Sequence, residues 1–266
     1  MNMKKFLLLV VLTLLLTGCG ADNTIKIGTI KYLNVNEDAL IKSYALTKDA
    51  TQYEPIFFDN ISGAVAALQA GQIDELSTYE CVGDYLVYQN QNLVSTMNEP
   101  VLIDMFCCAM RKEDTALKAE FDAAINEMNV DGTLTQLIKT YIHDANHGDN
   151  LTAIEMPAFY DDSMIKIGVT GDLPIFDYIR ADNTPAGFNT AVLAEISKRI
   201  GKNFVLVQVD SGARAVALQS GEIDVIFWVV TPKEDRNLPK DFDKPEGVIL
   251  TVPYFSDEIV HVKLTK

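Results

Sequence analysis

The chain has 266 residues, of which 48% are hydrophobic, and it carries a formal net charge of −15 at pH 7. This apolar share is enough to fill a real core. The acidic balance argues against nucleic acid and anionic lipid as partners.

The N-terminal residues have the pattern of a targeting segment. Lys4 and Lys5 form a charged region, Phe6 to Leu16 form an apolar region, and Thr17-Gly18-Cys19 follows. The apolar run is too short to span a bilayer comfortably, which favours cleavage over an uncleaved anchor helix. We therefore expect residues 1–18 to be a signal peptide that is removed before Cys19.

Two motifs recur in the same order along the rest of the chain. Ile25-Lys-Ile-Gly-Thr29 returns as Ile165-Lys-Ile-Gly-Val169, and Leu68-Gln-Ala-Gly-Gln-Ile-Asp74 returns as Leu218-Gln-Ser-Gly-Glu-Ile-Asp224. The two offsets are nearly equal, so chance is a poor explanation. The repeats predict two similar units, and two like lobes that face each other form a cleft in which small molecules bind.

Each unit alternates strands and helices. The first is expected to hold the strand Ile25–Gly28, a helix near Glu37–Leu46, the strand Tyr53–Phe58, a helix capped by Asn60 or Ser62 and ended by Gly71, and a strand after Asp74. Next come the helices Ala119–Met128 and Leu134–Ile142, with Thr133 as the cap of the second, and the polar linker His143–Asn150. The second unit is expected to hold the strand Ile165–Val169, the helix Phe188–Ile200 stopped by Gly201, the strand Phe204–Val209, a helix capped by Asp210 or Ser211 and ended by Gly221, and the strand Val225–Val230.

This alternation predicts an α/β fold with parallel sheets and helices on both faces. Ligands of such sheets lie beyond the carboxyl ends of the strands. Those ends are Thr29–Asn34 and Thr170–Phe176 after the first strands, Asp59–Ser62 and Asp210–Arg214 after the second, and Ser77–Glu80 and Val229–Arg236 after the third.

Several motifs together give the chain a family resemblance. They are the repeated Leu-Gln-x-Gly-x-Ile-Asp, Pro174-Ile-Phe176, Gly187-Phe188, the stretch Thr231–Arg236, Pro253–Asp257 and Asn126–Leu134. With them, the chain resembles the amino-acid class of extracellular solute-binding proteins of ABC importers, bacterial extracellular solute-binding protein family 3. The resemblance covers nearly all of residues 19–266 and implies the two-lobed type II periplasmic-binding-protein fold, with a ligand cleft between the lobes. Leu16–Cys19 resembles the lipobox of bacterial lipoproteins, which implies that Cys19 is lipidated.

The order of the motifs departs from that of the family. Pro-x-Phe, Gly-Phe and Pro-Tyr open family chains and the Asp-Gly-Thr-Leu helix pair closes them, whereas here that pair lies mid-chain. The chain therefore resembles a circular permutant. We expect residues 19–103 to form lobe B, completed by 259–266, and residues 104–258 to form lobe A with a hinge strand at its start.

The resemblance implies a carboxylate clamp in lobe A. By its spacing from Asp224, the clamp falls on Arg236 with Thr231, where a guanidinium fork suits a planar carboxylate. Arg214, in the first turn of a helix, is the second candidate, because a cation is unfavourable at that end of the helix dipole. Both arginines have an ordinary alternative as exposed surface side chains.

The chain lacks some residues of the family's ligand site. Leu173 and Ser211 replace two aromatic residues, and Tyr79, followed by Glu80, replaces the Asp that binds the ligand amine. Glu80 could substitute for that Asp, or the ligand could lack an α-amine. Walls of the site are expected from the strand-end residues Thr29 and Thr170 and from the aromatic residues Phe176, Tyr178, Trp228, Tyr32 and Tyr79, although Trp228 fits a core position better.

Signals for other chemistry are weak. Cys81, Cys107 and Cys108 have no disulfide spacing and are expected to be buried apolar residues. His143 and His147 have the spacing of helical metal ligands, but they fall in a polar linker and fit solvated positions better. We expect no metal, no cofactor and no enzymatic activity.

These observations predict a lipid-anchored receptor of an ABC importer. It would be a monomer outside the cytoplasm, held to the cell membrane through Cys19. It would bind a small polar solute, an amino acid or a related carboxylate, and deliver it to the membrane permease. The alternatives are a sensory receptor for a membrane kinase or chemoreceptor, and a periplasmic dehydratase-like enzyme on the same fold.

Overall fold

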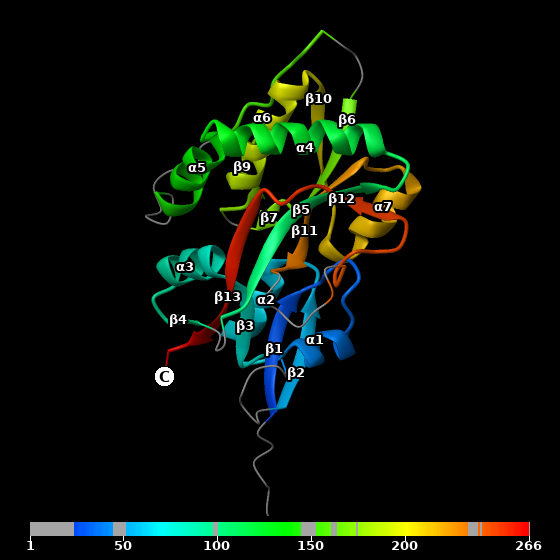
Figure 1. The fold of residues 1–266 in the computed structure, drawn as a ribbon. Coiled ribbons are helices and arrows are strands. Elements are labelled where there is room, and N and C mark those ends of the chain that lie inside the picture. The colour runs from blue at the N-terminus through cyan, green and yellow to red at the C-terminus, as the bar shows by residue number, and fades with distance from the viewer. Residues whose placement is uncertain are drawn as a thin grey trace, which may run out of the picture.

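The computed structural model describes residues 24–44, 52–97, 101–144, 153–160, 164–173, 175–233, 239 and 241–265. Cys19, His147 and Arg236 lie outside these ranges, so the predictions that rest on them stay untested. The described chain folds into two lobes, and long strands cross between them (Figure 1). No described helix is both long and apolar enough to cross a membrane.

The lobe that the chain enters first is called lobe B. It holds β1 (Thr24–Ile30), α1 (Glu37–Tyr44), β2 (Gln52–Phe58), α2 (Ile61–Gln69), β3 (Glu75–Tyr79), α3 (Glu80–Gln89) and β4 (Leu93–Met97). Lobe A holds β5 (Ile103–Arg111), α4 (Thr115–Val130), α5 (Thr133–Ile138), η1 (Lys139–His143), β6 (Met164–Val169), β7 (Asp172–Leu173), β8 (Asp177–Ile179), β9 (Pro185–Ala186), α6 (Phe188–Ile200), β10 (Asn203–Gln208), η3 (Ser211–Ala213), α7 (Arg214–Ser220), β11 (Val225–Pro232) and β12 (Val248–Leu250). The last strand, β13 (Phe255–Leu264), pairs with strands of both lobes.

Ten strands of the described chain form one sheet with the same arrangement in each lobe. The order is β10-β6-β11-β5-β13-β3-β1-β2, with β12 beside β5 and β4 beside β13. In each lobe the first strand lies between the second and the third, and all three are parallel. The next place is taken by a crossing strand, β5 in lobe A and β13 in lobe B, which runs antiparallel. The sheets are therefore mixed rather than wholly parallel, because the crossing strands return in the opposite direction.

The two repeated motifs contact each other within each lobe. In lobe A, a Cβ added to Gly168 would lie 2.4 Å from Cδ1 of Ile223. Two residues earlier in the strand, the backbone N–H of Lys166 donates to the Asp224 carboxylate (3.0 Å) and the Asp224 N–H donates to the Lys166 carbonyl (2.7 Å). Lobe B repeats these contacts, with Gly28 against Ile73 and Lys26 bonded to Asp74. The motifs recur as a pair because each one completes the packing of the other.

The motifs around helix α6 are also joined by contact. Gly187 has a φ of 103°, and a Cβ there would lie 2.3 Å from the Phe176 carbonyl oxygen. The next two N–H groups, of Phe188 and Asn189, donate to the carbonyls of Ile175 and Phe176. Glycine is required by both the backbone angle and the close approach. The helix then runs over the predicted residues, Phe188–Ile200, and ends at Gly201 in the left-handed conformation.

The helix pair between the units differs from its prediction. The first helix, α4, is longer than expected, and the second, α5, begins after Gly132 rather than with Thr133 as its cap. The Asp131 carboxylate accepts the Thr133 N–H at 2.9 Å, so Asp131 is the side chain that holds this turn. Beyond Ile138 the helix continues as the π-helical turn η1.

Both ends of the described chain lie in the sheet of lobe B. Gly28 of β1 and Val262 of β13 pair with Leu76 from its two sides. The expected boundary near residue 103 coincides with the start of β5. The circular order of the chain and the exact division into domains stay predictions.

Candidate ligand-binding site between the lobes

The two lobes contact each other at the carboxyl ends of their parallel strands. Asp172 of lobe A accepts the Ile61 N–H at the start of α2 (3.1 Å). Asp243, also of lobe A, accepts the N–H groups of Leu33 (2.7 Å) and Asn34 (2.9 Å) after β1. These bonds hold the loops around the predicted cleft together.

Burial changes the acidity of both carboxyl groups. Desolvation raises the pKa of Asp172 to about 6, against the opposing effect of backbone hydrogen bonds from Ser62 and Ile61. Desolvation likewise raises the pKa of Asp243 to about 7, and the Arg214 cation and the two N–H groups only partly oppose it. The contact between the lobes therefore takes up protons in a mildly acidic range.

A small cavity is lined by residues of both lobes, and we call it the strand-end cavity. Its volume is about 20 Å³, which suits about one water molecule. Its described wall consists of Thr29, Ile30, Tyr32, Ser77, Thr78, Tyr79, Leu173, Trp228 and Ile259. Thr29 and Tyr79 thus lie where the strand-end rule places ligand-binding residues.

Arg214 is a fully buried cation in contact with Trp228, which is a residue of the cavity wall. It is 1% exposed, and its guanidinium lies 5.0 Å from the centre of the Trp228 ring. Its hydrogen bonds go to main-chain oxygens, those of Trp228 (2.7 Å) and Ser211 (3.3 Å). It forms no ion pair with any residue that the structure describes. Desolvation lowers its pKa, although Asp243 and Asp177 raise it from further away.

An unpaired buried cation is costly unless another charge compensates it. Arginine keeps its proton in proteins, so the cost is not removed by neutralisation. The position therefore suits an anionic partner such as a carboxylate.

Two polar atoms beside Arg214 also lack partners within the described parts of the chain. They are the indole Nε1 of Trp228, a residue that is 3% exposed, and the hydroxyl of Ser211. Buried donors are nearly always hydrogen-bonded in folded proteins. Both atoms are therefore candidates for contact with a ligand or an ordered water.

Aromatic rings join the lobes around the cavity. The Tyr79 ring of lobe B packs edge-on against Trp228 (6.0 Å), Phe106 (4.7 Å) and Phe176 (6.3 Å), measured between ring centres. The Tyr79 hydroxyl also donates to Asp104 at 3.4 Å. Phe176 is wholly buried and is absent from the described cavity wall, so it supports Tyr79 from behind.

Thr170 has a positioning role in the structure. Its hydroxyl and the Gly171 N–H donate to one oxygen of Asp177, while the Asn189 amide donates to the other. The Tyr254 hydroxyl donates to Asn189 at 3.0 Å and extends this buried network. The network fixes the loop after β6, which carries Asp172 to the other lobe.

Thr231 lies at the end of β11, with its hydroxyl 4.0 Å from the Cys107 sulfur. Arg236, its predicted partner in the clamp, lies outside the described residues.

Cys81, Cys107 and Cys108 are free and buried, which confirms the prediction for them, and burial raises the pKa of Cys107 to about 11. Across the described ranges, no three His, Cys, Asp or Glu side chains are placed to hold a metal ion.

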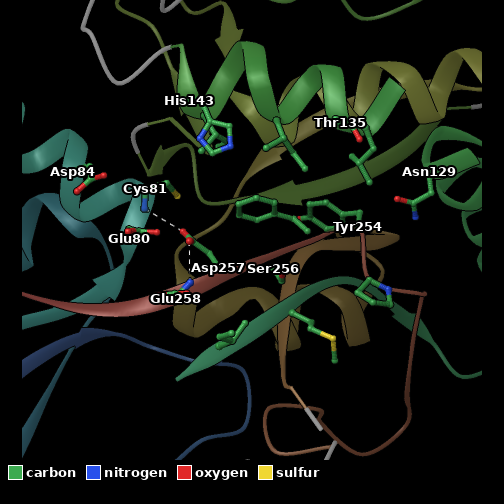
Figure 2. Close-up of a pocket in the computed structure, with 17 residues that line it drawn as sticks. Glu80, Cys81, Asp84, Asn129, Thr135, His143, Tyr254, Ser256, Asp257 and Glu258 are labelled. Carbon is green, nitrogen blue, oxygen red and sulfur yellow. Dashed lines mark hydrogen bonds between the residues drawn. The ribbon is translucent and has the colours of Figure 1, made fainter. Parts of the chain in front are cut away.

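Glu80 lines a different and larger pocket, which we call the hinge-side pocket. Its volume is about 570 Å³. Figure 2 shows Glu80 and Asp84 of α3 on one side, His143 and Thr135 on the other, and Asp257 of β13 between them. Desolvation, and then repulsion from Asp257 and Asp84, raises the pKa of Glu80. The structure thus separates Glu80 from Tyr79, its neighbour in sequence, because Tyr79 ends a strand and Glu80 begins a helix.

Sequence reasoning missed the two carboxylates that join the lobes. Asp172 was within a predicted strand-end loop but was not singled out, and Asp243 follows a loop with many charged residues. The sequence also favoured a core position for Trp228. This residue is buried, but it also lines the strand-end cavity. The available signal for Asp172 was its place two residues after Thr170, at the end of the first strand of its unit.

Comparison with known proteins finds a family match over part of the chain. Residues 165–262 match the family model "Bacterial extracellular solute-binding proteins, family 3". A relative in Campylobacter jejuni, described as a "Probable histidine-binding protein", is 28% identical over 100 residues. That alignment covers 38% of this chain and 36% of the relative, so the match spans about a third of the relative's length.

Solved structures with a similar fold are more distant in sequence. One is the ligand-binding component of an ABC-type import system from Staphylococcus aureus with zinc bound (13% identity, 91% of this chain and 66% of that chain, TM-score 0.46). Another is an ancestral arginine-binding protein bound to arginine (15% identity, 92% and 85%, TM-score 0.40). At these identities and scores, the structures carry no argument about a ligand. The match to the family model over residues 165–262 agrees with the family resemblance seen in the sequence.

Proposed function

We propose that this protein is the lipid-anchored substrate-binding protein of an ABC importer and that it closes its lobes on a small solute with a carboxylate. The observation that carries the proposal is Arg214, a buried cation without a described counter-ion where the lobes meet. The family supports a binding role rather than catalysis. The histidine-binding description of the Campylobacter jejuni relative supports an amino acid or a related acid as the solute.

Arg214 is the main carboxylate-binding residue in this proposal. A ligand carboxylate beside its guanidinium would supply the missing negative charge in a site from which water is excluded, where charge-assisted hydrogen bonds are strong. Thr231 and Arg236 are a second pair of carboxylate-binding residues in this proposal, on the basis of their spacing in the sequence. Tyr79 and Thr29 form walls of the cleft, while Phe176 and Thr170 hold those walls in place.

Binding requires the lobes to separate and close again. The strand-end cavity has space for about one water, so a solute enters only when the contacts of Asp172 and Asp243 are broken. Closure then re-forms these contacts around the ligand. The protein acts as a monomer outside the cytoplasm, and its closed form docks on the membrane permease.

A ligand screen tests the site. Amino acids and organic acids are screened by thermal shift, and hits are measured by calorimetry. A ligand at 100 times its Kd stabilises the folded protein by about 2.7 kcal/mol. A hydrogen bond to a charged group contributes about 1.5–3 kcal/mol, so we expect Arg214→Gln to weaken carboxylate binding about tenfold or more.

Arg199→Gln is the matched control for this variant. It also removes one guanidinium from lobe A, but Arg199 pairs with Glu127 and Asp131 on the surface helices, so binding should not change. Arg214→Lys keeps the positive charge but lacks the planar guanidinium group. It is the variant to measure if Arg214→Gln does not fold. Equal affinity of Arg214→Gln and the parent protein would contradict the assignment.

The anchor and the importer role need separate tests. Cys19→Ala should abolish lipid labelling of the protein in cells. Loss of the protein should also abolish uptake of the ligand found in the screen. A signalling response to that ligand without uptake would favour the sensory alternative.

A further inference from the structure

The strand-end cavity differs from an ordinary amino-acid site in the chemistry of its described wall. The wall is built from Thr, Ser, Tyr and apolar residues together with Trp228, and its described residues include no Asp, Glu, Lys or Arg. The indole Nε1 of Trp228 has no partner among the residues that are described, although it is buried. An indole nitrogen can only donate a hydrogen bond, so it needs an acceptor from whatever occupies the cavity.

The nearby carboxylates already have partners. Asp177 accepts bonds from Thr170, Gly171 and Asn189. Asp243 accepts the N–H groups of Leu33 and Asn34, and Asp104 accepts the Tyr79 hydroxyl. A ligand ammonium in the strand-end cavity would therefore compete with existing bonds for a counter-charge.

An ammonium group would also be disfavoured by its other neighbours. Arg214 lies on the face of the Trp228 ring, 5.0 Å from its centre, and like charges repel strongly where water is excluded. An ammonium can only donate hydrogen bonds, so it would face the Trp228 N–H donor to donor. A neutral carbonyl or hydroxyl oxygen in the same place avoids the repulsion and accepts that N–H.

We infer that the ligand is a 2-oxo or 2-hydroxy carboxylic acid rather than an α-amino acid. Its carboxylate pairs with Arg214, and the oxygen on its second carbon accepts the hydrogen bond from Trp228 Nε1. Trp228 thus determines specificity at the second carbon of the ligand. This inference rests on the proposed function, because it assigns a class of ligand to the same carboxylate site.

Matched acids with one carbon skeleton test the inference. The panel contains pyruvate, lactate and alanine; 2-oxoisocaproate, 2-hydroxyisocaproate and leucine; and 2-oxoglutarate, 2-hydroxyglutarate and glutamate. Their binding to the whole protein is measured by calorimetry. We expect the oxo or hydroxy acid of the skeleton that fits to bind at least tenfold tighter than the amino acid of the same skeleton.

Trp228→Phe removes the N–H and keeps an aromatic ring. In this variant, the ratio of the affinity for the oxo or hydroxy acid to the affinity for the amino acid of the same skeleton should fall at least threefold, while the oxo acid still binds. Tyr88→Phe is the control, because it removes the hydroxyl of an exposed aromatic residue of α3 that is not part of the described cavity wall; its preference should match that of the parent protein.

The outcomes separate the two proposals. If no carboxylate binds, both the proposed function and this inference are wrong. If an amino acid binds as tightly as its oxo and hydroxy counterparts, the carboxylate site stands and the inference is overturned. If Trp228→Phe folds and keeps the full preference, the role of Trp228 is overturned.

Discussion

Gly168 and Ile223 show at the residue scale why the two repeated motifs occur together. The Ile223 side chain occupies the space where any other residue at 168 would place its Cβ. Both residues lie in the interior of lobe A, and Ile223 is wholly buried. Neither position can therefore change without a response from the other.

We expect Gly168→Ala to destabilise the protein by about 1–3 kcal/mol, because overpacking a core forces side chains off their preferred rotamers. Ile223→Val removes the methyl group in the way and should by itself cost about 0.5–1.5 kcal/mol. The double variant should cost less than the sum of the two single variants. Urea unfolding measures each free energy. Additive costs would show that the contact is unimportant.

The sequence could predict part of the site at this scale. The strand-end rule located Thr29 and Tyr79, and an unfavourable position in the helix dipole drew attention to Arg214. The rule could not show that Arg214 has no ion pair among the described residues, since that depends on side chains from distant parts of the chain. Asp243 was missed for the same reason, because its partners Leu33 and Asn34 are about 210 residues away. The assignment to Arg236 stays a prediction.

Helix α2 shows at the element scale how a sequence ambiguity is resolved. Asn60 and Ser62 were both plausible caps. In the structure the Asn60 side chain accepts the Gly63 N–H at 2.8 Å, and Ser62 is exposed in the first turn. The Asp172 carboxylate from lobe A accepts a further N–H of this turn, that of Ile61. The start of α2 is thus stabilised from both lobes.

Asn60→Ala should therefore cost about 0.5–2 kcal/mol, the usual loss for a helix cap. Ser62→Ala is the matched control in the same turn and should change stability by less than about 0.5 kcal/mol. Chemical unfolding of the two variants measures both values. A larger loss of stability for Ser62→Ala than for Asn60→Ala would show that Asn60 is not the residue that caps the helix.

Long elements were predicted better than short ones. Helix α6 has apolar residues at regular helical spacing and a glycine stop, and it was predicted to the residue. Strands β7, β8 and β9 form a small separate sheet but have only two or three residues each. No periodicity can be recognised over that length. Helix α7 begins only at Arg214, after a 3₁₀ turn, and Asp210 makes no side-chain capping bond to the described chain.

The pairing of lobes is a whole-molecule property that should depend on pH. Asp172, near Asp177 and Asp210, and Asp243, near Arg214 and Asp104, both have pKa values raised above the ordinary value of 3.8. A carboxyl group with a raised pKa binds a proton more tightly in the closed form than in the open one. Closure is therefore favoured at low pH and loses this stabilisation as the pH rises through about 6 and 7.

We expect the fraction of closed protein to fall between about pH 4 and pH 7 in the absence of ligand. Energy transfer between dyes on the two lobes measures this fraction. The double variant Asp172→Asn, Asp243→Asn should flatten the dependence, whereas Asp182→Asn, at an exposed carboxyl group, should leave it unchanged. A closed fraction that rises with pH in the parent protein would contradict the assignment.

The proposed circular permutation requires the chain ends to lie near each other. Lys26 and Leu264 lie at the same end of the lobe B sheet, on strands that flank β3. Two strand spacings of about 4.8 Å put their backbones about 10 Å apart. We expect a chain that joins Lys266 to Thr24 through a short linker, and that opens near Asn150, to keep the fold.

Circular dichroism and thermal unfolding compare the rejoined chain with the parent. A similar spectrum, cooperative unfolding and the same ligand response would support the permutation. Failure of the rejoined chain to fold, under conditions in which the parent folds, would rule it out.

Strand β13 also has a consequence for how the protein is made. It pairs with β5 in lobe A and with β3 and β4 in lobe B, although those three strands are synthesised more than 140 residues earlier. Until the ribosome has passed Leu264, β3 and β4 lack their shared neighbour and expose strand edges that invite aggregation. Neither lobe can complete its sheet until β13 has been synthesised. The export that the proposed function requires suits this order of events, because both lobes can then fold together once β13 has emerged.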